Sequence, residues 1–239
     1  MTIILSIETS TELASAALLM DGGVISRELS GVQTHSQGIL PMVQALLKQG
    51  GIALNQCDAI GFGCGPGAFT GVRTACGIVQ GLAFGADLPV IPVVSLLAMA
   101  EGARTPALEL GCADLVCVLD ARMEEVYWAR YRLVGADWQV VSEPALSSFA
   151  QLLATVDFSG AALVHGSGLK LDGLPSATVT LPCMPHAEQI ARLALTGYRA
   201  GRGVPAAQAQ PLYLRNKIAL TTEERMLARQ GANSGKGAA

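Results

Sequence analysis

Charged and aromatic residues are scarce in this sequence. Asp, Glu, Lys and Arg make up 15% of its 239 residues, and Phe, Trp and Tyr make up 5%. The net charge of −3 leaves no basic surplus, and nucleic-acid affinity depends largely on neutralising phosphates. We therefore do not expect the chain to hold RNA alone. The best local basic patch is Arg192, Arg199 and Arg202 on an expected helix, for which a solvated helix face is the simpler interpretation.

Closely spaced metal ligands are missing as well. The six cysteines stand singly and form no CxxC pair, and the three histidines lie far apart. Structural zinc sites need clustered Cys and His, so the sequence predicts no metal site. Scattered thiols, with no basic stretch ahead of an apolar core at the N-terminus, predict a reducing, cytoplasmic location without a secretory signal. The residues concerned are Cys57, Cys64, Cys76, Cys112, Cys117, Cys183, His35, His165 and His186.

Long apolar runs are also absent. Segments such as Val90 to Ala100 are too short and too interrupted to cross a bilayer, so no membrane association is expected. Hydrophobic residues nevertheless make up 51% of the chain. That share indicates a large buried core, or an apolar face that meets a partner.

Strand-like and helix-like segments alternate along the chain. Three apolar strands should open it as an antiparallel meander: Ile3–Thr9, Ala14–Met20 and Val24–Ser30. A helix over residues 36–49 follows, and Pro41 should kink it or start a new helix. Thr105-Pro106 resembles a linker, after which the alternation resumes. Strands mixed with helices on this scale indicate an α/β protein.

Two glycine-rich segments resemble nucleotide-binding motifs only superficially. Gly63-x-Gly65-x-x-Ala68 matches a loose dinucleotide fingerprint, but Pro66 removes a backbone N–H that would face the pyrophosphate. Gly166-Ser167-Gly168 runs into Leu169-Lys170 and lacks the Gly-Lys-Ser/Thr order of a P-loop. A dinucleotide-dependent oxidoreductase is therefore disfavoured, although this reading would be revived by clear nicotinamide or flavin binding.

Three glycines at four-residue spacing mark the helix after the first glycine loop. Gly77, Gly81 and Gly85 should lie along one side of it, and each costs about 1 kcal/mol relative to alanine. A flat ridge of this kind permits close packing. The sequence leaves open whether the ridge packs against the protein's own sheet or against another subunit.

Motifs distributed over nearly the whole chain resemble the TsaB family. They are Ile7-Glu8-Thr9-Ser10-Thr11, Thr34-His35-Ser36 with Leu40-Pro41, the segment Gly65-Pro66-Gly67-Ala68-Phe69-Thr70-Gly71-Val72-Arg73, Asp120-Ala121-Arg122 with Glu125-Val126-Tyr127, and Pro211-Leu212-Tyr213-Leu214-Arg215-Asn216. They occur in the expected order, and together they are specific where the glycine loop alone would not be.

The resemblance implies an actin-like, sugar-kinase-like fold of two related lobes. We expect an N-terminal lobe over residues 1–104, a C-terminal lobe over 105–216 and a largely flexible tail over 217–239. It also implies a role in making N6-threonylcarbamoyladenosine in tRNA. In that family the chain supports a homologous catalytic subunit, TsaD, which holds the metal, and the P-loop ATPase TsaE supports turnover. The tRNA is contacted only within the complex.

The residues agree with a non-catalytic role. In the catalytic relative, two histidines four residues apart on one helix face grip a metal. The corresponding positions here are Ser95 and Met99, which do not suit a hard catalytic metal. Cys64 has no histidine nearby in the sequence, and no mechanism can be written for His35.

A partner interface is expected on the helices of the N-terminal lobe, and the same surface could make a homodimer when the partner is absent. Its candidate residues are Ile39, Leu40, Val43, Leu46, Val72, Arg73, Cys76, Gly77, Gln80 and Gly81. No cofactor is expected, although weak nucleotide or phosphate binding remains open at Thr9, Ser10, Thr11 and Gly65. The alternative function is a stand-alone ATP-binding kinase or peptidase on the same fold.

Overall fold

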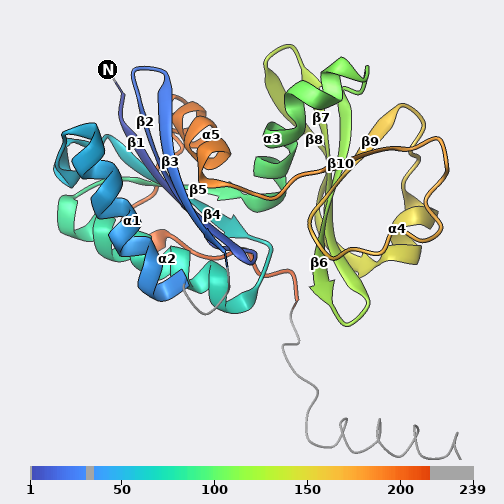
Figure 1. The fold of residues 1–239 in the computed structure, drawn as a ribbon, viewed down its shortest axis with the longest axis horizontal. Coiled ribbons are helices and arrows are strands. Elements are labelled where there is room, and N and C mark those ends of the chain that lie inside the picture. Colours follow the sequence, from blue (N-terminus) through green and yellow to red (C-terminus); the bar gives the residue numbers. More distant parts are fainter. Residues whose placement is uncertain (1, 31–34, 216–239) are drawn as a thin grey trace, which may run out of the picture.

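Two five-stranded sheets stand side by side, each with helices packed against it (Figure 1). The computed structural model describes residues 2–30 and 35–215. Thr34 and Asn216 of the family motifs, together with the expected tail at 217–239, lie outside these residues. Among the residues that are described, no helix is both long and apolar enough to span a bilayer.

The first sheet has the spatial order β3-β2-β1-β4-β5. Its strands are β1 (Ile4–Glu8), β2 (Leu13–Met20), β3 (Gly23–Ser30), β4 (Ala59–Gly65) and β5 (Val90–Val94). The first three form the expected antiparallel meander, while β4 lies parallel to β1 and β5 parallel to β4. β1 and β4 are buried along their whole length, as is typical of central strands covered on both faces.

The second sheet repeats this topology. Its strands are β6 (Asp114–Arg122), β7 (Glu125–Val134), β8 (Asp137–Ser148), β9 (Ala161–His165) and β10 (Val179–Pro182). The order is β8-β7-β6-β9-β10, again with an antiparallel meander followed by two parallel strands. This correspondence confirms the prediction of two related lobes of mixed sheet plus helices.

Helices cover both faces of the first sheet. α1 (His35–Gly50) and α2 (Phe69–Ala86) pack on one face through an apolar core that includes Leu46, Phe62 and Val79. α5 (Ala187–Arg199) covers the other face through its small residues, and Ala194 packs directly on Gly61 of β4. The ends of α5 carry Glu188 and Arg199, each of the sign that the helix dipole favours.

The closing helix of each lobe crosses to the other. α3 (Ser95–Glu109) follows β5 but packs mainly on β6, β7 and the core of the second sheet. α5 follows β10 but packs on the first sheet. α4 (Phe149–Thr155) covers the outer face of the second sheet, and Ser148 caps its N-terminus. Short 3₁₀ turns occupy Leu54–Gln56 and Ala206–Gln208.

Two local expectations need correction. Thr105-Pro106 is not a linker, because it lies inside α3, so this helix crosses the expected boundary between residues 104 and 105. α1 does not restart at Pro41 but runs unbroken through it. Pro41 is exposed, where water can satisfy the carbonyl that loses its helical partner.

The close contact between β4 and α5 generates a stability prediction. A Cβ added at Gly61 would lie 2.6 Å from the Cβ of Ala194, so Gly61→Ala should cost about 1–3 kcal/mol through overpacking. Gly81→Ala is the matched control, since no described atom lies within 4 Å of its added Cβ, and it should gain about 0.5–1 kcal/mol. Urea unfolding of the two variants measures both effects, and equal midpoints would contradict the described packing.

Candidate functional site: the interlobe cleft and the outer face of helix α2

A buried carboxyl group ends the first strand. Glu8 is fully buried; the Ser95 hydroxyl donates to its Oε2 at 2.8 Å, and the Ser10 amide donates to its Oε1 at 2.5 Å. Burial raises the pKa of Glu8 above its usual value, although these hydrogen bonds act in the opposite direction. Glu8 therefore joins β1 to the start of α3, and its oxygens are already engaged inside the protein.

The glycine loop packs directly on the loop that follows β1. The Ala68 amide donates to the Ser10 carbonyl at 2.6 Å, and the Thr9 hydroxyl donates to the Gly71 carbonyl at 2.7 Å. A Cβ at Gly67 or Gly71 would collide with the Ser10 or Thr9 backbone. These glycines are required because two backbones meet here, which leaves the start of α2 seated on the first loop.

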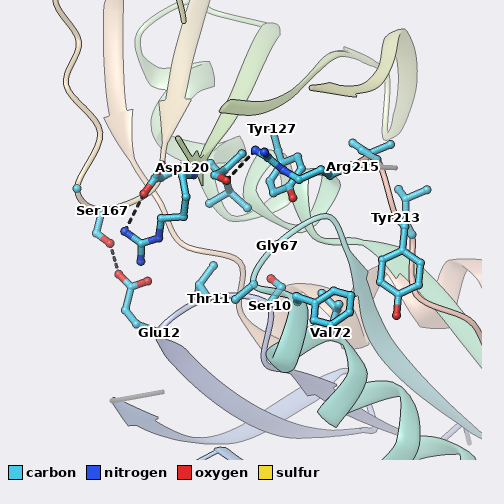
Figure 2. Close-up of a pocket in the computed structure, with 18 of the residues that line it drawn as sticks. Ser10, Thr11, Glu12, Gly67, Val72, Asp120, Tyr127, Ser167, Tyr213 and Arg215 are labelled. Atoms are coloured by element: carbon cyan, nitrogen blue, oxygen red, sulfur yellow. Dashed lines mark hydrogen bonds and ion pairs between the residues drawn. The ribbon is translucent and has the colours of Figure 1, made fainter. Parts of the chain in front are cut away.

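A cleft of about 680 Å³ separates the lobes above this contact (Figure 2). The first lobe contributes residues 10–12, 67–69 and 72, and the second contributes 119–123, 127, 167–168 and 184. The segment 212–215 completes the lining. The lining includes both polar and apolar side chains, a composition typical of small-molecule sites.

The four expected phosphate contacts separate into two pairs. Ser10 and Thr11 line the cleft. Thr9 is fully buried, and its hydroxyl bonds to α2. Gly65 has a φ of 100° and packs against Val72 and the Leu212 carbonyl. The structure thus brings only two of these four residues to the cleft.

Charged groups around the cleft are largely paired with one another. Arg122 lies 3.0 Å from Asp120, and Arg215 contacts the Glu125 carboxylate at 2.5 Å while donating to the Ala121 carbonyl at 3.1 Å. Across the cleft, the Ser167 hydroxyl donates to the Glu12 carboxylate (Figure 2). The cationic side chains of the lining are therefore already neutralised.

The C-terminal segment straps the two lobes together. The Gln80 side chain donates to the Ala209 carbonyl at 2.9 Å, and the Leu212 amide donates to the Cys64 carbonyl at 2.7 Å. Arg73 donates to the Tyr213 hydroxyl at 2.7 Å while stacking on Phe69. This strap, residues 209–215, then reaches the second lobe through Arg215.

The outer face of α2 is flat and exposed. Gly77, Gly81 and Gly85 are exposed, and a Cβ added at any of them would meet no described atom within 4 Å. Phe84, on the same side, is 84% exposed. The sequence left open whether this ridge packs against the protein's own sheet. In the structure its glycines face away from that sheet.

Half of the ten expected interface residues lie in the core instead of on the surface. Leu40, Arg73, Gly77 and Gly81 are exposed and Gln80 is half-buried. Five are buried inside this chain: Ile39, Val43, Leu46, Val72 and Cys76. Their apolar stripe packs against the first sheet, so a surface that binds a partner has to be redrawn from the exposed residues.

Comparison with known proteins identifies the family. A family model named TsaD, tRNA N6-adenosine threonylcarbamoyltransferase, matches residues 7–219. The tRNA threonylcarbamoyladenosine biosynthesis protein TsaB of Haemophilus influenzae is 37% identical over 90% of this chain and 94% of its own length. The Escherichia coli TsaB is 37% identical over 90% and 96%. The chain belongs to the TsaB family. The model match also places it in the wider TsaD family.

Solved structures of similar proteins share the whole fold. YeaZ from Pseudomonas aeruginosa superposes with a TM-score of 0.80 at 39% identity, covering 90% of this chain and 100% of its own. A second P. aeruginosa structure, of an uncharacterized protein with similarity to peptidase YeaZ, gives 0.81 at 40% identity with the same coverage. The two-lobed arrangement is thus shared with both of these solved structures along 90% of this chain.

Ser95 and Met99, the two positions that the family resemblance predicts for the catalytic relative's histidines, are engaged inside this TsaB-family chain. Ser95 donates to Glu8, and Met99 is fully buried in the core of the second sheet. Among residues 2–30 and 35–215, no three His, Cys, Asp or Glu side chains cluster as metal ligands would. Burial raises the pKa of the Cys64 thiol to about 12, aided by the nearby Glu8 charge, so this thiol is a poor nucleophile.

The histidines take structural positions. His35 is 3% exposed, and its Nε2 lies 3.2 Å from the Glu12 carbonyl. His186 caps α5, where its Nδ1 accepts from the Glu188 amide at 3.2 Å, and burial lowers its pKa. His165 lies against its neighbouring carbonyl, that of Gly166. Each ring contacts a backbone group, as is common for histidines with a structural role.

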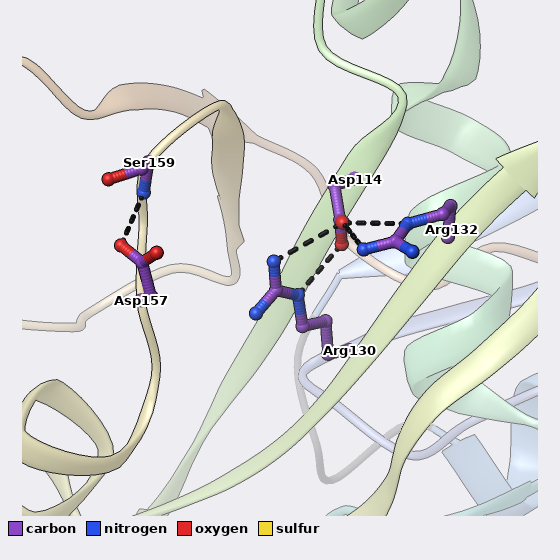
Figure 3. A network of polar contacts seen from close by, with 5 residues as sticks. All are labelled: Asp114, Arg130, Arg132, Asp157 and Ser159. Carbon is purple, nitrogen blue, oxygen red and sulfur yellow. Dashed lines mark hydrogen bonds and ion pairs between the residues drawn. The ribbon is translucent and has the colours of Figure 1, made fainter.

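Charged clusters outside the cleft are structural or solvated. Figure 3 shows Arg130 and Arg132 of β7 both reaching Asp114 at the start of β6. Burial raises the pKa of Asp114, but the two arginines outweigh it and the net shift is downward. On α5, Arg192 pairs with Glu188 at 2.9 Å, and Arg199 and Arg202 are exposed. The structure thus adds nothing that favours an RNA contact there.

Sequence reasoning missed Phe84 and the strap. Phe84 lies three residues after Gly81 and seven after Gly77, spacings that place it on the same side of a helix, and this signal was present in the sequence. The Tyr213 and Arg215 motif was recognised without a role. Its contacts join residues more than 90 positions apart, which no local pattern shows.

The buried Glu8 generates a pH prediction. Its folded-state pKa lies above 4.5, so the folded chain binds this proton more tightly than the unfolded chain does. Ionising Glu8 therefore costs stability as the pH rises above 4.5. Glu8→Gln keeps an acceptor for the Ser10 amide, and its stability relative to the parent should increase between pH 4.5 and 7. Urea unfolding across this range measures the difference, and parallel curves would contradict it.

Proposed function

We propose that this chain is a non-catalytic assembly subunit for tRNA N6-threonylcarbamoyladenosine modification, which binds and supports a TsaD-like catalytic subunit. The observation that carries the proposal is the outer face of α2, where Gly77, Gly81 and Gly85 form an exposed flat ridge beside Phe84. The names of the relatives, tRNA threonylcarbamoyladenosine biosynthesis protein TsaB, supply the pathway. A TsaE-like ATPase belongs to the same proposal, and tRNA is contacted only within the complex.

The chemistry of this face suits a protein partner. Mid-helix glycines lower helix stability, and these have no intramolecular contact among the described residues that would offset the cost. Small residues let a second helix approach closely. An aromatic side chain that is 84% exposed gains stability when buried, and aromatic residues often dominate interface energies. Leu40 of the neighbouring helix α1 is a second exposed apolar side chain, at 44%.

The interior of the chain supports a non-catalytic role. Ser95 and Met99 stand at the positions expected for the metal ligands, Glu8 is engaged by Ser95 and Ser10, and the Cys64 thiol is protonated at neutral pH. A stand-alone peptidase would need an activated nucleophile. A kinase would need unpaired cationic groups for the phosphates of ATP, whereas Arg122 and Arg215 are both paired.

Size-exclusion chromatography of this chain with the TsaD-like subunit of the same organism tests the proposal. The unmodified chain should shift to a stable heterodimer. Phe84→Glu should weaken the complex by at least about ten-fold, since it places a charge in a desolvated interface. Leu108→Glu, at an exposed apolar residue on α3 that is 48% exposed, is the matched control and should bind normally.

Two outcomes would contradict this assignment. A chain that ignores the catalytic subunit would refute the assembly role. A Phe84→Glu variant that binds as well as the unmodified chain would place the interface elsewhere. We further propose that the same face makes a homodimer when the partner is absent. Light scattering at increasing concentration should then show a dimer for the unmodified chain and a monomer for Phe84→Glu.

A further inference from the structure

The interlobe cleft is a built site that the proposed assembly role does not use. It encloses about 680 Å³, within the range of small-molecule pockets, and it is lined from both lobes and from the strap. None of the exposed glycines of α2 contributes to it. The cleft and the docking face are therefore separate surfaces that meet only through α2 and the strap.

One hydroxyl group at the cleft is left without a well-aligned hydrogen bond. Ser10 is 1% exposed and belongs to the lining, and although its side chain lies beside the Glu8 carboxylate, its Oγ makes no well-aligned hydrogen bond to any residue of 2–30 or 35–215. Burying a hydroxyl unpaired is costly, and such a group calls for a specific explanation. In Figure 2 the Ser10 side chain lies at the base of the space between the lobes, below Asp120 and Tyr127.

A tight hairpin turn forms the opposite rim. Arg122, Met123 and Glu124, between β6 and β7, have φ angles of 64°, 56° and 61°, a left-handed conformation that residues with a side chain rarely adopt. Arg215 of the strap holds this turn through the Ala121 carbonyl and the Glu125 carboxylate. Arg122 pairs with Glu125 in the strand register, so Met123 and Glu124 form a two-residue hairpin turn, in which positive φ angles are usual. The strap thus fixes a well-defined turn as one wall of the cleft.

The charges of the cleft select the class of ligand. Glu12 accepts from Ser167 and forms no ion pair within the described residues, while Arg122 and Arg215 are neutralised by Asp120 and Glu125. The N-terminus of α2 adds about half a positive charge, less than the full negative charge of Glu12. A polyphosphate would therefore meet net repulsion, whereas hydroxyl or amino groups would find carboxylate acceptors.

The apolar part of the lining suits a flat ring. Phe69, Tyr127 and Tyr213 line the cleft together with Leu119 and Met184. Aromatic and thioether groups pack well on planar rings. A carboxylate that accepts from the hydroxyls of a ribose is a common mode of nucleoside recognition.

We propose that the interlobe cleft binds an uncharged nucleoside, with Glu12 accepting from its hydroxyl groups and Tyr127 packing against its base, and that it disfavours nucleoside polyphosphates. This inference does not depend on the partner interface, because none of its contacts involve the glycine face of α2. It also gives the strap a function, which is to hold the hairpin that forms one wall of the site.

Isothermal titration of the full chain with adenosine, guanosine, cytidine and uridine, and separately with ATP, tests the proposal. At least one nucleoside should bind saturably with one site per chain, with an affinity insensitive to salt. ATP should bind at least about ten-fold more weakly, because its phosphates meet the unpaired carboxylate.

Glu12→Gln provides the discriminating variant. It keeps an acceptor for Ser167 but removes the charge, so nucleoside affinity should fall about five-fold, the difference between charged and neutral acceptors, while ATP affinity should rise. A merely structural defect would lower both, and thermal melting checks that the variant is folded. Glu109→Gln, at an exposed residue outside the cleft, is the control and should change neither.

Three results would overturn the inference. They are the absence of saturable binding for all four nucleosides at millimolar concentration, tighter binding of ATP than of any nucleoside, or a Glu12→Gln variant that leaves both affinities unchanged. None of them bears on whether the chain joins its catalytic partner.

Discussion

The backbone contact between the first loop and the start of α2 determines the positions of the cleft and of the outer face of α2. Gly67 and Gly71 pack on Ser10 and Thr9 without space for a side chain, and two hydrogen bonds fix the approach. The N-terminal end of α2 thereby becomes part of the cleft floor, and its outer face is turned to solvent. The glycine loop, which resembles a phosphate-binding loop in sequence, is used here to seat a helix.

The two lobes are also held together by the exchange of their closing helices, α3 and α5. Because α3 packs on the second sheet and α5 on the first, neither lobe is a single continuous segment of chain. Glu8, Ser95 and the strap add polar contacts between elements distant in sequence. A repeated topology with crossed helices holds the lobes together through several independent contacts, and the cleft is formed where those contacts leave space.

Much of this architecture could be predicted from local patterns. The three opening strands lie within one residue of their predicted bounds at each end, because the strand composition and turn residues that predict them are local. Which helix residues face a partner was harder to predict from the sequence. The apolar stripe of α1 through Ile39, Val43 and Leu46 has the spacing of a core-facing helix, and only the fold shows that it faces the chain's own sheet. The glycine spacing of α2 did not show whether the ridge faces the chain's own sheet or the solvent; the structure was needed to decide this.

The crossing of α3 could not be read from sequence for a related reason. Thr105-Pro106 has the composition of a linker, but packing of the flanking Ala103 and Ala107 in the second core outweighs the weak helix propensity of these two residues. Ser10 was expected as a possible phosphate contact by analogy with the actin-like fold. Its lack of a well-aligned hydrogen bond appears only when every neighbour is placed.

Hydrogen exchange of this chain alone and in the presence of the TsaD-like subunit tests the central claim most directly. The account predicts increased protection in the exposed turns of α2, around Gly77 to Phe84, with little change on the outer face of the second lobe over α4. Protection concentrated on α4 or β8 with α2 unchanged would contradict it, because the partner would then bind a surface that the glycine ridge does not form.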